Sequence, residues 1–107
     1  MKLPEDVVIP REKLTQYLLV PQVKNDKSKF LAQAGFTQDN PDALEAAIRR
    51  LIQEQDAVQD REDEYGTFYR VTGVLHGISK DLNVITIWIH ATKEHNYRFI
   101  TLKPDKE

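Results

Sequence analysis

The chain has 107 residues, 40% of them hydrophobic and 30% charged, with a formal net charge of −2. This mix predicts one soluble globular domain over 1–107, and the net charge excludes a uniformly basic nucleic-acid-binding surface. The absence of cysteine excludes thiol catalysis, disulfides and thiolate metal sites.

The first half of the chain, about residues 10–55, has the hydrophobic periodicity of helices. The segment IPREKLTQYLLVP predicts a helix over about 10–19, with a proline at each end. A short helix follows in DKSKFLAQAGF, where Asp26 suits the N-cap and Gly35 suits the C-terminal turn. The strongest pattern is NPDALEAAIRRLIQEQ, which Asn40 caps and whose buried stripe is Leu44, Ile48, Leu51 and Ile52.

The second half, about residues 57–103, changes to a period of two. AVQDRED predicts an acidic strand at a sheet edge, where charge discourages aggregation. After a turn at Gly66, TFYRVTGVL predicts a strand with Tyr69, Val71 and Leu75 on one face; a turn in HGISKDLN follows, and NVITIWIH and YRFITLK predict further strands. The expected fold is α+β, with N-terminal helices packed on one face of a three- or four-stranded antiparallel sheet.

The segment TIWIH bears on which side chains are available to a ligand. Alternation along this strand separates two sets of side chains: Ile85, Ile87 and Ile89 on one face, and Thr86, Trp88 and His90 on the other. The first set has the composition of a core, so we expect the helices to cover it. The second set is then expected on an open face, because two helices cannot easily cover both faces.

Five motifs occur in the order KLTQYLL, KSKFLAQAGFT, EYGTFYRV, VITIWIH and RFITLKP. In this order they resemble a family of small bacterial domains of unknown function, which occur alone, notably in cyanobacteria, and at the C-terminal ends of haemagglutinin-repeat toxins of the contact-dependent inhibition type. The resemblance spans about residues 11–104. It is carried by Lys13, Leu14, Tyr17, Lys27, Gly35, Phe36, Thr37, Tyr65, Gly66, Thr67, Thr86, Trp88, Arg98 and Thr101.

The toxin relatives resemble in layout the barnase–EndoU–colicin–RelE group of ribonucleases, whose chemistry lies on the open face of the sheet. The resemblance therefore implies a toxin-like, metal-independent ribonuclease that needs no cofactor, with RNA as its partner. The implied catalytic residues are two cations that hold the phosphate and two threonines that position it: Lys27, Arg98, Thr86 and Thr101. The implied substrate-binding residues are three aromatic side chains that stack on a base, and one imidazole: Trp88, Tyr65, Tyr69 and His90.

A second hypothesis is a non-catalytic protein-binding module, or an inactive relative, that pairs with a small immunity or antitoxin-like protein encoded nearby. Convergence of Lys27, Trp88 and Arg98 in one concave site favours the nuclease. A flat apolar patch, with Arg98 tied to a carboxylate and Lys27 far away, favours the binding module. A third outcome is that Trp88 is buried and no open face exists.

The remaining expectations concern metals, membranes and location. No carboxylate–histidine cluster has strong ligand spacing, so we predict no metal site. No apolar run approaches the roughly 20 residues that span a membrane, and the N-terminus is unlike a signal peptide, so we expect a cytoplasmic protein without membrane contact. The sequence leaves the oligomeric state open.

Overall fold

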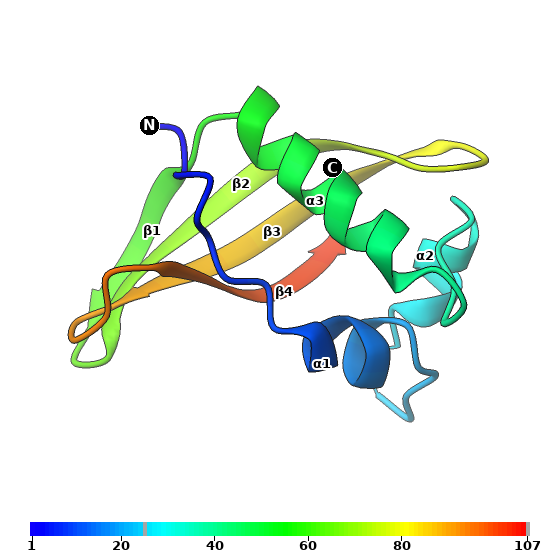
Figure 1. Ribbon diagram of the computed structural model, residues 1–107, viewed down its shortest axis with the longest axis horizontal. Coiled ribbons are helices and arrows are strands. Elements are labelled where there is room, and N and C mark those ends of the chain that lie inside the picture. The colour runs from blue at the N-terminus through cyan, green and yellow to red at the C-terminus, as the bar shows by residue number, and fades with distance from the viewer. Residues whose placement is uncertain (25, 107) are drawn as a thin grey trace.

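The computed structural model describes residues 1–24 and 26–106. The elements are α1 (Arg11–Lys13), η1 (Leu14–Leu18), α2 (Ser28–Ala32), α3 (Pro41–Glu54), β1 (Val58–Asp63), β2 (Gly66–His76), β3 (Asp81–Ala91) and β4 (Tyr97–Pro104). The strands form one antiparallel sheet in the order β1-β2-β3-β4, and α3 lies across one of its faces (Figure 1). The predicted α+β class, with N-terminal helices packed against an antiparallel sheet, is confirmed.

The first helical segment differs from the single helix predicted over about 10–19. Three α-helical residues in α1 are followed by one turn of π-helix in η1, where the Leu19 N–H donates to the Leu14 carbonyl at 3.0 Å. The turn buries Leu14 and Leu18 completely and leaves Tyr17 beside them, partly exposed. Single π-helical turns are rare and are frequently found at functional sites.

The helices α2 and α3 begin near their predicted positions, but their caps differ from the prediction. Lys27, and not Asp26, is the N-cap residue of α2. The Asp26 carboxylate nevertheless accepts hydrogen bonds from the N–H and the hydroxyl of Ser28, at 2.9 and 2.6 Å. Asn40 is the N-cap residue of α3 as predicted, yet its side-chain carbonyl accepts from the Thr37 N–H at 2.7 Å instead of from the helix.

The strands follow the sequence prediction closely in position. β1 is an edge strand with all its residues exposed, as the acidic pattern predicts. β2 and β3 pair from Gly66↔Ala91 to His76↔Asp81, so their loop is shorter than the predicted turn. The predicted shared face of β2 is confirmed, since Val71 and Leu75 are buried and Tyr69 packs against the core.

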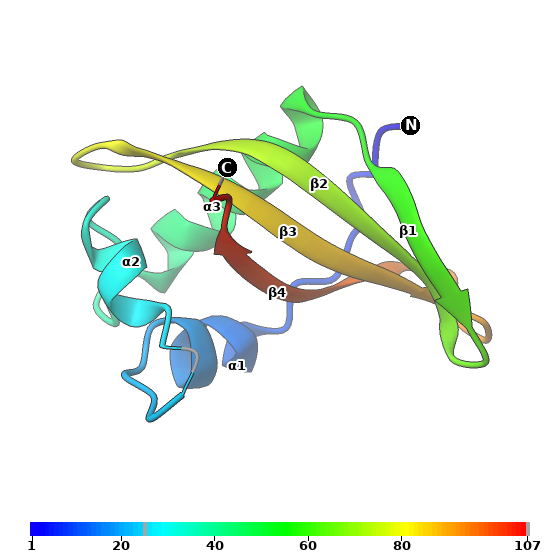
Figure 2. The same cartoon turned by 180° about the vertical axis from the view of Figure 1, so that it is seen from behind.

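The two faces of β3 are the reverse of the prediction. On the helix side Leu82, Val84, Thr86 and Trp88 are buried. The three isoleucines are half-buried on the other face, which no helix crosses in Figure 2. The assignment of Ile85, Ile87 and Ile89 to the covered face, and of Thr86, Trp88 and His90 to the open face, is therefore wrong.

The physical reason for the reversal is that the polar atoms of Thr86 and Trp88 satisfy one another. The Trp88 indole N–H donates to the Thr86 hydroxyl at 2.9 Å, and that hydroxyl donates to the Val71 carbonyl at 2.9 Å. The indole also packs edge-on against Phe99, with ring centroids 5.3 Å apart. Tryptophan buries more apolar area than isoleucine, so its face gains more from burial once the N–H has a partner.

The N-terminal segment covers part of the outer edge of β4. The Val8 N–H donates to the Tyr97 carbonyl and the Phe99 N–H donates to the Val8 carbonyl, both at 2.8 Å. Leu3, Val7 and Ile9 add to the core beneath. No helix of the described residues is long and apolar enough to cross a membrane.

Candidate functional site

The site predicted from the sequence is not assembled on the open face. Thr86 and Trp88 have no exposed surface in this structure, and their roles toward a substrate stay predictions. Arg98 is exposed, with its guanidinium 3.7 Å from the Glu94 carboxylate. Lys27 lies at the β4 edge, in contact with Thr101. Of the four predicted catalytic residues, the structure brings Lys27 and Thr101 into contact. Thr86 is buried, and Arg98 lies beside Glu94.

The other predicted substrate-binding residues lie toward the opposite end of the sheet. Tyr65 is 69% exposed in the β1–β2 turn. On the helix-side face, the His90 ring stacks on Tyr97 with centroids 4.5 Å apart, and Tyr69 meets Tyr97 edge-on at 5.3 Å. Burial raises the pKa of Tyr97, and the neighbouring Tyr69 hydroxyl raises it further. Tyr69, His90 and Tyr97 form an aromatic group. The binding of a base by Tyr65, Tyr69 and His90 stays a prediction.

Four side chains converge at the β4 edge, and we call them the β4-edge cluster: Lys13, Tyr17, Lys27 and Thr101. Lys27 Nζ donates to the Thr101 hydroxyl oxygen at 3.1 Å and to the Tyr17 hydroxyl oxygen at 3.4 Å. Lys13 Nζ lies 5.9 Å from the centroid of the Tyr17 ring, and Lys27 Nζ lies 5.4 Å from it. The residues come from α1, η1, the start of α2 and β4.

The cluster changes the acidity of its phenol. Burial raises the pKa of Tyr17, but the Thr101 hydroxyl, the Lys27 ammonium group and the charge of Lys13 together outweigh that effect. The net pKa of Tyr17 is therefore below the ordinary tyrosine value. A phenol in this environment ionises more readily than one in water.

Sequence reasoning missed Lys13 and Tyr17 as site residues, although both carry the family resemblance. The signal that was present is the spacing of Lys13 and Tyr17, four residues apart on a helical segment, which places their side chains side by side. The contact with Thr101 lies beyond any local pattern, because 74 residues separate it from Lys27.

The open face is a second candidate surface. Its centre is the row Ile85, Ile87 and Ile89 of β3. Residues directly opposite one another in an antiparallel pair share a face, so the register adds these neighbours: Phe68, Arg70 and Thr72 from β2, and Arg98, Thr101 and Lys103 from β4. This surface is an apolar row between cationic side chains.

The cations of the open face are only loosely paired. Arg70 lies 3.8 Å from the Asp60 carboxylate, and both side chains are substantially exposed. On the neighbouring edge strand, the Arg61 guanidinium lies 4.1 Å from the centroid of the Phe68 ring and covers it. Exposed pairs of this kind are worth roughly 0–1 kcal/mol each, so a binding partner can replace them at little cost.

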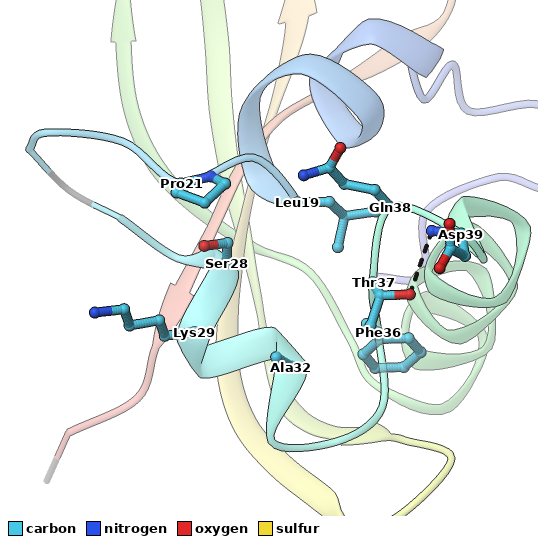
Figure 3. A pocket seen from close by; sticks show the side chains of 9 residues that line it. All are labelled: Leu19, Pro21, Ser28, Lys29, Ala32, Phe36, Thr37, Gln38 and Asp39. Atoms are coloured by element: carbon cyan, nitrogen blue, oxygen red, sulfur yellow. Dashed lines mark hydrogen bonds between the residues drawn. The ribbon is translucent and has the colours of Figure 1, made fainter.

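A cavity of about 440 Å³ lies between η1, α2 and the loop that follows α2 (Figure 3). Its charged lining residues are Lys29 and Asp39, whose side chains lie on opposite sides of the cavity in Figure 3. The Thr37 hydroxyl in its wall accepts a hydrogen bond from the Asp39 N–H at 3.2 Å. The cavity has no converging set of reactive groups. Within 1–24 and 26–106, no cluster of histidine and carboxylate side chains suits a metal ion.

The fold and the two surfaces define a small α+β domain with an uncovered sheet face and a cationic cluster at the sheet edge. The profile of a family described as a domain of unknown function (DUF6883) matches residues 2–106, and the chain belongs to this family. The expected membership of an uncharacterised domain family is thereby confirmed. Comparisons with curated proteins and with solved structures give no match.

Proposed function

We propose that this domain is a protein-binding module whose open face docks an acidic partner protein. The observation that carries the proposal is the row Ile85, Ile87 and Ile89, half-buried on a sheet face without a covering helix. An antiparallel sheet with one solvated face ordinarily places polar residues there. A contiguous apolar row rimmed by charge is typical of an interaction site.

The charges around the row favour an acidic partner over a second copy of this chain. Arg70, Arg98 and Lys103 flank the isoleucines, and Lys103 forms no salt bridge among the described residues. Two copies meeting through this face would bring like charges together, which costs free energy. A partner that presents aliphatic side chains within a ring of carboxylates matches both features.

Without a partner, long side chains protect the apolar row from water. Arginine and lysine lay their methylene stems along apolar surface while their charged ends stay solvated. Arg70 and Arg98 stand directly opposite Ile87 and Ile89 in the register, in position for this role. On docking, these stems move aside or become part of the interface, where arginine is a frequent anchor.

Photo-crosslinking in the producing cell tests the proposal. The amino acid p-benzoylphenylalanine is placed at Ile87 in one chain and at the exposed Gln53, on the helix side, in a control chain. We expect one acidic protein to crosslink at Ile87 and not at Gln53. The purified partner should then bind the chain, and Ile87→Glu should weaken binding at least about tenfold while Gln53→Glu leaves it unchanged. Equal crosslinking at both positions would contradict the proposal.

A second candidate function is metal-independent cleavage of RNA, and the contact of Lys27 with Thr101 at 3.1 Å favours it. A lysine supplies charge for a developing phosphorane, and the ionised form of Tyr17, a phenolate, is a candidate base that accepts the proton of the 2′-hydroxyl. The site of cleavage is then the β4 edge instead of the open face. This function connects the chain with the toxin-like proteins that its motifs resemble.

Incubation of the purified chain with total RNA in the presence of EDTA tests cleavage. Discrete fragments are expected with the wild type and with the control Lys29→Ala, whose side chain is exposed on α2. Lys27→Ala and Tyr17→Phe should each abolish the fragments while the chain stays folded. RNA that is intact after incubation with the wild type would rule the activity out for the isolated domain.

A further inference from the structure

The β4-edge cluster differs chemically from the open face, because it gathers hydrogen-bond donors instead of apolar side chains. Lys27 Nζ reaches Tyr17, 10 residues before it, and Thr101, 74 residues after it. Lys13 Nζ lies 5.9 Å from the centroid of the Tyr17 ring. Two ammonium groups and two hydroxyl groups therefore meet in one partly exposed place.

The cluster holds positive charge that carboxylates do not balance. Neither Lys13 nor Lys27 forms a salt bridge within the described part of the chain. The neighbouring carboxylate of Asp26 is held by the N–H and hydroxyl of Ser28. Two cations close to one phenol repel each other, and an anion that contacts both removes that repulsion. The lowered pKa of Tyr17 reflects the same positive potential.

The donors of the cluster suit a tetrahedral oxyanion. An ammonium group has three N–H donors, of which Lys27 directs two to Tyr17 and Thr101, and a hydroxyl has one O–H donor. The other donors of these side chains are enough in number for the three or four oxygens of a phosphate. A planar carboxylate is matched best by the fork of an arginine, and this cluster contains none.

We propose that the β4-edge cluster is a phosphate-binding site, in which Lys13 and Lys27 supply the charge and Tyr17 and Thr101 orient the oxygens. The inference goes beyond the docking of a protein partner, and it shares its residues with the proposed RNA cleavage but requires only that a phosphate group binds. A phosphate group binds here whether or not a bond is cleaved.

An NMR titration of the full chain tests the site. It monitors the amide signals of Lys27 and of the residues next to Tyr17 and Thr101. One series uses inorganic phosphate and another uses a short single-stranded RNA. We expect saturable shifts, with Kd increased about tenfold or more in Lys27→Met and Thr101→Val. Thr101→Ser keeps the hydroxyl and should bind like the wild type. Lys29→Met removes the same charge from an exposed position and should change Kd less than about twofold.

The two series also separate the sources of the phosphate group. Saturation by inorganic phosphate alone indicates a small phosphorylated ligand. Tighter binding of RNA, through the same amides and weakened by the same variants, indicates a nucleic-acid backbone. The inference is overturned if neither ligand saturates these amides, or if Lys29→Met weakens binding as much as Lys27→Met. Thermal unfolding of each variant shows that a loss of binding is not a loss of fold.

Discussion

The two faces of strand β3 offer the most informative comparison in this molecule. On the helix side, Thr86 and Trp88 have no exposed surface and share a hydrogen bond of 2.9 Å. On the other side, three isoleucines remain half-buried with no helix above them. A single strand thus places its polar-looking residues in the core and its most apolar residues at the surface. The difference shows that partner availability for polar atoms, and not hydropathy alone, decides which face is covered.

The largest expected effect comes from truncating the buried face at its centre. Trp88→Ala removes a fully buried indole and should lower the free energy of unfolding by about 3–5 kcal/mol. Ile87→Ala on the open face should cost less than half as much, because that side chain already contacts water. Urea unfolding, monitored by far-UV circular dichroism, measures the free energy of unfolding of both variants. This signal does not depend on tryptophan fluorescence, which Trp88→Ala removes. Similar losses in the two variants would break the comparison.

The next effect isolates the hydroxyl that allows tryptophan to be buried. Thr86→Val leaves the Trp88 indole N–H without its acceptor and should cost about 1–3 kcal/mol. Thr86→Ser retains the hydroxyl and should cost less. In the double variant with Trp88→Phe, which has no N–H, much of the Thr86→Val penalty should vanish. A double-mutant cycle in urea measures this coupling, and strictly additive losses would show that the hydrogen bond contributes nothing.

These two predictions indicate how much of the molecule could be read from its sequence. The period of two separated the residues of β3 into the correct pair of faces, and the edge strand, the longest helix and the fold class followed from local patterns. The choice of the covered face could not follow, because it depends on the contact of Trp88 with Phe99 across strands and on the acceptor that Thr86 provides. A hydropathy pattern does not predict which buried donor finds an acceptor on a neighbouring side chain.

The candidate site was predictable to a similar degree. Lys27 and Thr101 were selected as residue types that handle phosphate, and the structure places them 3.1 Å apart. Arg98 was grouped with them by chemistry, yet it lies beside Glu94 on the open face. The extra residue in the bulge of β4 between its pairings with Ile87 and Trp88 places Arg98 opposite Ile89 and Thr101 opposite Ile87, on the same face, and a bulge of this kind leaves no mark in a pattern of alternation.

A smaller effect sharpens the contrast between the faces with one chemical change. Ile87→Thr on the open face should alter the free energy of unfolding by less than about 1 kcal/mol, because the new hydroxyl is hydrated and threonine suits a strand. Val84→Thr makes the matched change on the buried face, where the hydroxyl has no water, and should cost about 1–3 kcal/mol. Tryptophan fluorescence in urea measures both. An equal cost would mean that the open face is covered in solution.

The smallest effect concerns Tyr17 and appears only in alkaline solution. Since the folded-state pKa of Tyr17 lies below its ordinary value of 10.0, its ionised form favours the folded state. This stabilisation is fully present above the unfolded-state pKa and is lost as the pH falls through the folded-state pKa, so it is absent at neutral pH. Relative to Tyr17→Phe, the wild type should therefore gain stability as the pH rises toward about 10. Absorbance of the ionised phenol should show Tyr17 titrating before Tyr97, whose pKa is raised. Lys27→Met should move the Tyr17 titration upward, and an unchanged titration in that variant would show that the ammonium group does not act on the phenol.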